Sequence, residues 1–96
     1  MKKSIINQVE KVLRKRTSCW NDVSIEKKET DEWAMFLIRC EDGFCSSPVV
    51  EAVFEVSDAF GMAYQDADIY ACIDAEMRDG LPRPVINLNV RITITQ

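Results

Sequence analysis

The sequence predicts one α+β domain over residues 1–96, with its elements in the order α-β-β-α-β-β. Two stretches carry apolar residues at the spacing of a helix, and four others alternate apolar and polar residues as half-buried strands do. Because short turns join these elements, we expect a four-stranded, mainly antiparallel sheet. Both helices then pack on one face of the sheet, and the other face stays open to solvent or to a partner.

Residues 47–64 are the most apolar stretch and predict the central helix of the domain. Ser47 suits the N-cap, Pro48 suits the first helical position, and Gly61 lies where the helix should end. Three acids recur at spacings of four and three and share one stripe: Glu51, Glu55 and Asp58. Because the other faces are apolar, we expect the rest of the chain to pack around this helix.

Residues 4–16 predict a first, amphipathic helix. Its apolar side chains form one stripe at helical spacing: Ile5, Ile6, Val9, Val12 and Leu13. The helix closes on Arg14, Lys15 and Arg16, where cations complement the negative end of the helix dipole.

Residues 22–28 and 32–41 predict a β-hairpin with a two-residue turn at Thr30 and Asp31. This register sets Ile25 opposite Phe36 and Val23 opposite Ile38. We prefer it because it gathers six residues on one face: Val23, Ile25, Ala34, Phe36, Ile38 and Cys40. The opposite face then carries Trp33, Met35 and Leu37, beside Ser24, Glu26 and Lys28.

Residues 67–77 and 85–96 predict the last two strands, and the Gly- and Pro-containing residues 79–84 predict a loop between them. The first of these strands directs one set of side chains inward: Ile69, Ala71, Ile73, Ala75 and Met77. Its other side carries Asp68, Tyr70, Cys72, Asp74 and Glu76. In the final strand we expect Ile86, Leu88, Val90, Ile92 and Ile94 to face inward, and Asn87, Asn89, Arg91, Thr93 and Thr95 to face outward.

The formal net charge of −4 conceals a separation of charge along the chain. Residues 1–16 hold six bases and one acid, whereas residues 41–80 hold ten acids and the single base Arg78. This separation predicts a molecule with a basic and an acidic side. Basic residues come too early for the apolar segment of a signal peptide, so we expect a cytoplasmic protein whose cysteines are free thiols.

The cysteines do not have the spacing of a metal site. Cys19, Cys40, Cys45 and Cys72 contain no C-x-x-C pair, and the predicted register places Cys40 and Cys72 on opposite faces of the sheet. We therefore expect no metal and no cofactor. Cys45 lies just before the central helix, whose N-terminus can lower the pKa of a thiol, but the sequence shows no resolving partner.

The sequence also lacks the usual catalytic constellations. The chain has no histidine, and its three isolated glycines match no phosphate-binding loop. Asp68, Asp74 and Glu76 share a strand face, where neighbouring carboxylates lie about 7 Å apart and suit acid–base chemistry or a divalent cation. We prefer the simpler explanation that these carboxylates belong to a solvated strand face, because an open sheet face offers no pocket for catalysis. We expect a protein that is not an enzyme, with a metal- or thiol-dependent enzyme as the alternative.

The outer face of the sheet is the candidate binding surface. It combines large apolar side chains with an acidic rim, as an interface requires. The predicted partner-binding residues are Trp33, Met35, Leu37, Asp68, Tyr70, Asp74, Glu76 and Arg91.

These features predict a small acidic protein-binding module of the inhibitor, immunity, anti-defence or chaperone type. Its partner is expected to be a protein with a basic surface, or a second copy of the chain in a homodimer. In element order and acidity alone the chain resembles type III secretion chaperones, which are small, acidic and dimeric, although it is shorter. Nucleic-acid binding through the basic first helix is the second alternative, and the acids elsewhere oppose it.

Overall fold

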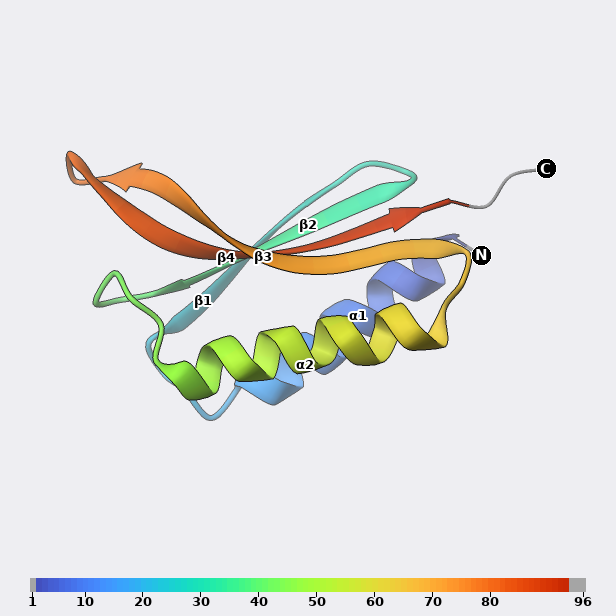
Figure 1. Ribbon diagram of the computed structural model, residues 1–96, viewed down its shortest axis with the longest axis horizontal. Helices are drawn as coiled ribbons and strands as arrows, with labels where there is room; N and C mark the ends of the chain where they lie inside the picture. Colours follow the sequence, from blue (N-terminus) through green and yellow to red (C-terminus); the bar gives the residue numbers. More distant parts are fainter. Residues whose placement is uncertain (1, 94–96) are drawn as a thin grey trace.

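The computed structural model describes residues 2–93 and confirms the predicted α-β-β-α-β-β order. The elements are α1 (Lys2–Thr17), β1 (Val23–Glu29), β2 (Trp33–Cys40), α2 (Ser47–Ala63), β3 (Ala67–Arg78) and β4 (Leu81–Ile92). All three strand pairings are antiparallel, and the spatial order of the sheet is β1-β2-β4-β3. Both helices lie side by side under one face of the sheet, as predicted (Figure 1).

The core lies between the helices and the sheet. Its fully buried side chains come from α1, α2, β2 and β4, and the largest are Phe36, Ile6, Leu13, Ile38 and Leu88. The apolar stripe of α1 is buried as predicted, except that Val12 is 37% exposed. Within residues 2–93, no helix combines the length and apolar character needed to cross a bilayer.

Helix α2 begins one residue earlier than predicted. Ser46 is the N-cap, although its side chain makes no capping hydrogen bond, and Ser47 is the first helical residue. The expectation that the chain surrounds this helix is wrong. Only one side of α2 is fully buried, through Val49, Ala52, Val53, Val56 and Ser57, while Glu51, Glu55 and Asp58 are exposed as predicted. Helix α1 packs beside α2, so the two helices form a single layer under the sheet.

The register of the first hairpin differs from the prediction by two residues. Ile25 pairs with Ile38 and Val23 pairs with Cys40. The turn is formed by residues 31–32 and closed by a 2.8 Å hydrogen bond from Thr30 N to Trp33 O. A shift of two residues leaves every side chain on its predicted face, because side chains alternate with a period of two. The apolar pattern therefore could not distinguish the two registers.

The second hairpin is tighter than the predicted loop at residues 79–84. Asp79 and Gly80 alone form the turn, with φ values of 55° and 77°, and β4 begins at Leu81 instead of residue 85. Positive φ at both central residues matches the right-handed twist of the flanking strands. Pro82 and Pro84 lie two residues apart, so their nitrogens share one side of β4. On its β2 side, no strand among residues 2–93 pairs with β4 at these positions. The predicted inward Ile94 and outward Thr95 lie outside the described residues.

Strands β3 and β4 extend past the rest of the sheet. Strand β2 pairs with β4 only between Ile86 and Arg91, whereas β3 follows β4 to its first residue. Residues 74–78 and 81–85 therefore form a two-stranded arm with Ile73 at its base, and the arm curves away at the end near the start of α2 (Figure 1). Gly43, in the loop after β2, lies against the side chain of Arg83 with φ 88°; a Cβ there would come within 2.4 Å of the guanidinium.

Candidate functional site

The outer face of the sheet carries two adjacent rows of aromatic, apolar and charged or amide side chains. Trp33, Arg91 and Asp68 lie side by side across β2, β4 and β3, and Met35, Asn89 and Tyr70 form the next row. Tyr70 is 49% exposed, Asp68 and Arg91 are exposed, and Trp33 and Met35 are half-buried. No described helix covers this face (Figure 1). We call Trp33, Met35, Asp68, Tyr70 and Arg91 the platform.

The neighbouring part of the outer face is held by a chain of amide hydrogen bonds. Asn89 Nδ2 donates to Asn87 Oδ1 at 2.7 Å, and Asn87 Nδ2 donates to Asp74 Oδ2 at 3.0 Å. Both asparagines are buried. The Cys72 thiol contacts the same carboxylate at 3.8 Å, and burial, followed by the charge of Asp74, raises the pKa of this thiol. Asp74 is therefore engaged within the sheet.

Arg39 forms the second set of contacts on this face. Its Nη2 donates to Glu76 Oε1 and its Nη1 donates to Glu26 Oε1, each at 2.9 Å. The hydrogen bonds that Arg39 donates hold the pKa of Glu76 below its usual value, and the acceptance of these bonds by Glu76 and Glu26 raises the pKa of Arg39. Because Arg39 and Glu76 come from β2 and β3, this ion pair spans β4 and braces the sheet.

The eight predicted partner-binding residues therefore divide into two groups. Five form the platform, whereas Asp74 and Glu76 are bonded to neighbours and Leu37 is only 8% exposed. The expected acidic rim is also balanced by Arg39, Arg78 and Arg91 on the same face. Most acids of the predicted acidic stretch lie elsewhere, on the loop after β2, on α2 and on the turn before β3: Glu41, Asp42, Glu51, Glu55, Asp58 and Asp66.

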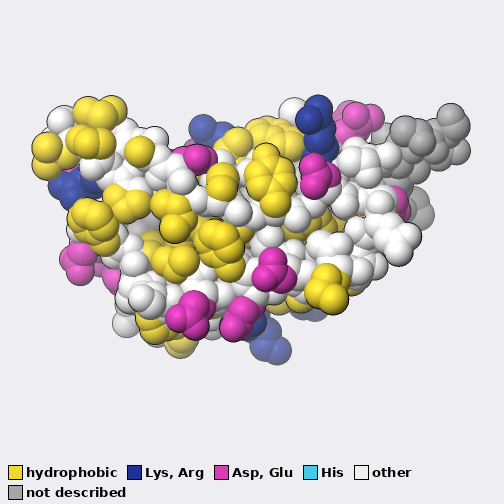
Figure 2. All heavy atoms as spheres, in the orientation of Figure 1, with side chains coloured by type: hydrophobic (Ala, Val, Ile, Leu, Met, Phe, Trp, Pro, Cys, Tyr) yellow, Lys and Arg dark blue, Asp and Glu magenta, His cyan; other side chains and the backbone are white. Residues whose placement is uncertain are grey.

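The most exposed apolar side chains of the sheet lie on the arm and at its base. The sequence analysis did not predict that they would be exposed. Ile73 is 55% exposed and Met77 is 68% exposed, although their strand pattern predicted that both face the core. Phe44, in the adjacent loop, is also 68% exposed. Figure 2 shows apolar side chains gathered on this end of the molecule, over the arm and the start of α2. The periodicity gave the side of the strand correctly, but the helices end before the arm does.

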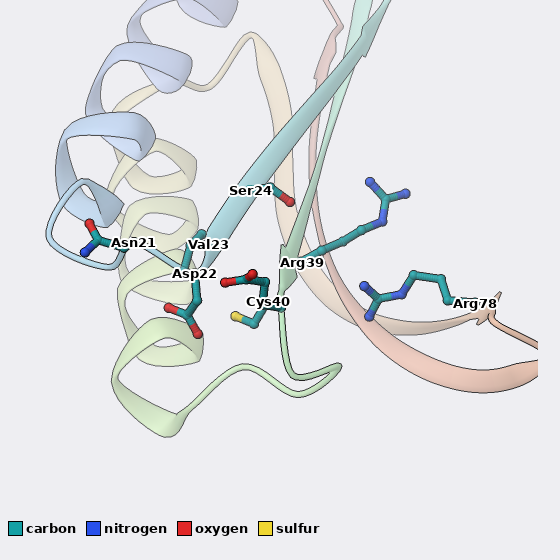
Figure 3. A pocket seen from close by; sticks show the side chains of 8 residues that line it. Asn21, Asp22, Val23, Ser24, Arg39, Cys40 and Arg78 are labelled. Carbon is teal, nitrogen blue, oxygen red and sulfur yellow. The ribbon is translucent and has the colours of Figure 1, made fainter.

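A half-open pocket of about 330 Å³ lies where the ends of β1 and β2 meet the arm (Figure 3). Two cations, Arg39 and Arg78, and two acids, Asp22 and Glu41, contribute to its lining. Nε and Nη2 of Arg78 are buried without a hydrogen-bond partner among the described residues, although Nε lies 3.3 Å from Glu76 Oε2. No local pattern predicts this pocket, because Arg78 reaches it from the tip of the arm.

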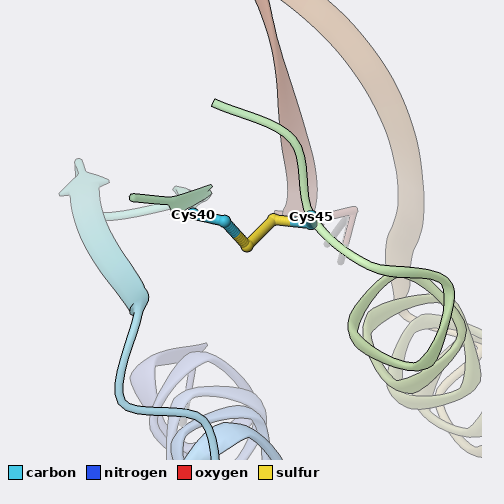
Figure 4. The surroundings of a disulfide bond; sticks show 2 residues. All are labelled: Cys40 and Cys45. Carbon is cyan, nitrogen blue, oxygen red and sulfur yellow. A yellow bond between two sulfur atoms is a disulfide. The ribbon is translucent and has the colours of Figure 1, made fainter. Parts of the chain in front are cut away.

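Cys40 and Cys45 form a disulfide (Figure 4). The prediction of free thiols is therefore wrong for these two residues and correct for Cys19 and Cys72. The bond ties the end of β2 to the loop that leads into α2, and it supplies the resolving partner that the sequence did not show for Cys45. Although the hairpin register differs by two residues, Cys40 and Cys72 lie on opposite faces of the sheet as predicted. Within residues 2–93, no three His, Cys, Asp or Glu side chains are grouped to hold a metal ion.

Several bases of the predicted basic side are engaged in ion pairs. Arg14 contacts Glu10 at 2.9 Å, and Arg16 contacts Glu55 of α2 at 2.6 Å. Lys27 of β1 reaches Glu10 at 2.6 Å, and this hydrogen bond is the main cause that lowers the pKa of Glu10. These pairs join α1 to α2 and to the sheet and leave fewer free cations on α1.

The platform and its supporting contacts lie on a sheet backed by helices on one face and left uncovered on the other among residues 2–93. No family model, no curated protein and no solved structure matches this chain.

We expect Glu76→Gln to weaken the acid dependence of stability. The pKa of Glu76 is lower in the folded chain than its usual 4.5, so the unfolded chain binds more protons near that pH. The Glu76 contribution is therefore present above the unfolded pKa and is lost as the pH falls through the folded pKa. Between about pH 5 and pH 3, urea unfolding should show a smaller loss of stability in Glu76→Gln than in the wild type. Asp58→Asn, on the exposed side of α2, is the control, and equal slopes for Glu76→Gln and wild type would contradict the assignment.

We expect Cys45→Ser to lower the free energy of unfolding by about 2 kcal/mol, which is the chain-entropy contribution of a loop closed over a separation of five residues. Urea unfolding without reductant measures the difference, and reductant should bring the wild type to the same stability as the variant. Cys19→Ser changes a free, exposed cysteine and should have no effect. A wild type that is equally stable with and without reductant would show that the bond contributes nothing.

Proposed function

We propose that this protein is a non-enzymatic protein-binding module that holds its partner on the platform. The observation that carries the proposal is the adjacency of Trp33, Met35, Tyr70 and Arg91 on an uncovered sheet face. Aromatic residues, methionine and arginine are the types enriched at protein interfaces, and tryptophan, tyrosine and arginine dominate binding hot spots.

The structure around the platform supports this function by limiting its motion. Asn89 lies between Met35 and Tyr70 and is hydrogen-bonded to Asn87, and Arg39 links the three strands beside it. A binding surface that is ordered before the partner arrives loses less conformational entropy on binding. Tyrosine and tryptophan add contact area with few rotatable bonds, which reduces the cost further.

The proposed partner is a protein that meets an apolar and aromatic patch with one arginine and one aspartate beside it. This differs from the partner with a basic surface that the sequence suggested, because acids of the outer face are already opposed by arginines. Asp68 and Arg91 have opposite charges, so complementarity at the platform would fix orientation more than it raises overall attraction. Inhibitors, immunity proteins, anti-defence proteins and chaperones all fit this description.

The thiol-dependent enzyme is the second candidate, because Cys45 has a disulfide partner and lies just before α2. The same bond bears on the cytoplasmic location expected from the sequence, since disulfides persist mainly in oxidising compartments. We retain the cytoplasm as part of the proposal. Alkylation of the protein inside its native cells distinguishes a reducing from an oxidising compartment. Cys40 and Cys45 react with the reagent in a reducing compartment and stay protected as a disulfide in an oxidising one.

A photoreactive benzoylphenylalanine in place of Tyr70 tests the platform. In cells that naturally produce the protein, we expect irradiation to give covalent adducts of a defined mass above 11.0 kDa. The same probe in place of Asp58, on the exposed side of α2, is the matched control and should give few adducts. Trp33→Ala, added to the Tyr70 probe, should reduce the yield by roughly tenfold if Trp33 is a hot-spot residue.

Circular dichroism of the Trp33→Ala variant shows whether it remains folded, and Met62→Ala, an exposed apolar change on α2, serves as its control. Adducts at twice the mass of the chain represent a second copy and are counted separately. Equal yields from the probes at positions 70 and 58, or a yield unchanged by Trp33→Ala, would rule out the platform as the binding surface.

A further inference from the structure

The two edges of the sheet differ in how they are protected against further strand pairing. Strand β1 is short and carries Glu26, Lys27, Lys28 and Glu29, and charged residues of this kind discourage edge-to-edge contact. Strand β3 is twelve residues long, contains no Pro or Lys, and pairs with β4 in one unbroken register. Alternate residues of β3 present their N–H and C=O groups to the free edge, because no other described strand pairs there.

Apolar side chains accompany this free edge. Ile73 and Met77 are largely exposed on the helix side of β3. Helix α2 turns Val50, Phe54 and Gly61 to one side, since they lie four and seven residues apart. That side faces β3, because a Cβ at Gly61 would lie 3.4 Å from the Ile69 carbonyl oxygen, and Val50 and Phe54 are only half-buried. Figure 2 views this edge and shows the apolar gathering between the arm and α2.

We propose that β3 pairs antiparallel with β3 of a second copy, about a two-fold axis at Ile73, to form one continuous sheet across a homodimer. This inference rests on the free edge of β3. It shares Asp68 and Tyr70 with the platform, because both residues belong to β3, but it does not depend on the platform binding another protein. Edge pairing satisfies the free backbone groups of both copies with the same interaction. The two copies of α2 then come together on one side of the sheet, where Val50 and Phe54 are half-buried in the single chain.

The side chains of β3 are self-complementary in this register. Ile73 meets itself, Ala71 meets Ala75, and Ile69 meets Met77 on the helix side. On the outer side Asp68 meets Arg78, Tyr70 meets Glu76, and Cys72 meets Asp74. Apolar residues thus oppose apolar residues, and the one directly opposed pair of charges has opposite signs, which favours cross-strand pairing.

The neighbouring registers lack this property. A shift of two residues keeps the faces matched, but in one direction it sets Asp68 opposite Glu76, and in the other it sets Asp74 opposite itself. A shift of one residue places acids against the apolar helix side. Like charges directly opposite one another are destabilising, so the sequence of β3 selects the register centred on Ile73.

Arg78 supplies a further reason. Its Nε and Nη2 are buried without a hydrogen-bond partner among the described residues, and its side chain extends toward β2 (Figure 3). Rotation of this side chain toward the free edge would bring the guanidinium to Asp68 of the second copy. A charge-assisted hydrogen bond would then replace two unsatisfied donors in each chain.

Sedimentation equilibrium across a concentration series tests the dimer and its register. We expect the wild type to form a dimer, and Ile73→Lys to raise the dissociation constant by roughly tenfold or more, because two cations then meet at the axis. Ile73 is largely exposed in the single chain, so this change should leave the fold intact, as circular dichroism will show. Met62→Lys also replaces an exposed apolar side chain with lysine, but near the C-terminal end of α2, and should leave the dimer unchanged.

The charge pair provides the sharper test. Asp68→Arg and Arg78→Asp should each weaken the dimer by roughly tenfold, since each creates two like-charge contacts, and the double exchange should restore it. A chain that stays monomeric at every concentration, a dimer unaffected by Ile73→Lys, or a double exchange that weakens the dimer further than either single change would each overturn the proposal. If Ile73→Lys dissociates the dimer but leaves the adducts of the Tyr70 probe unchanged, the dimer and the platform are separate surfaces.

Discussion

Strand β4 is the constraint on which the rest of the structure depends, because both of its faces are buried. On the helix side Leu88 and Val90 are fully buried beneath α1 and α2, and on the outer side Asn87 and Asn89 are buried as well. A buried amide without a hydrogen-bond partner costs about 1–3 kcal/mol. The register with β3 places Asp74 within reach of Asn87, so the polar residues of β4 constrain its neighbours as firmly as the apolar ones do.

This requirement divides the outer face into a part whose polar groups are engaged within the sheet and a part with free surface, on which the proposed function rests. Asp74, Glu76 and Arg39 find their partners inside the chain and hold three strands together. Trp33, Tyr70 and Arg91 lie beside them with exposed or half-exposed surface and no such role. Side chains whose polar groups are satisfied internally stabilise the sheet, whereas side chains with free surface can lower the free energy of a complex.

The unequal lengths of the elements produce the second surface. Strands β3 and β4 each have twelve residues, whereas β2 has eight. The arm therefore extends beyond both the helix layer and strand β2. Apolar residues that would otherwise enter the core, such as Ile73 and Met77, are exposed there. Their exposure beside an unprotected strand edge is the physical basis of the inferred dimer, which would also join two platforms on one continuous face.

The sequence by itself determined the order of the elements and the face on which each strand residue lies, because apolar periodicity records the inside and outside of a single element. Five of the eight residues predicted from the sequence to bind a partner lie together on the platform. The tertiary structure decided the hairpin register, since a slip of two residues preserves every face. It also decided that Leu37 is buried, that Glu76 is paired with Arg39, that Cys40 is bonded to Cys45, and that Ile73 is exposed. Each of these depends on which element lies alongside and how far it extends, and the pattern within one strand contains no information about its neighbours.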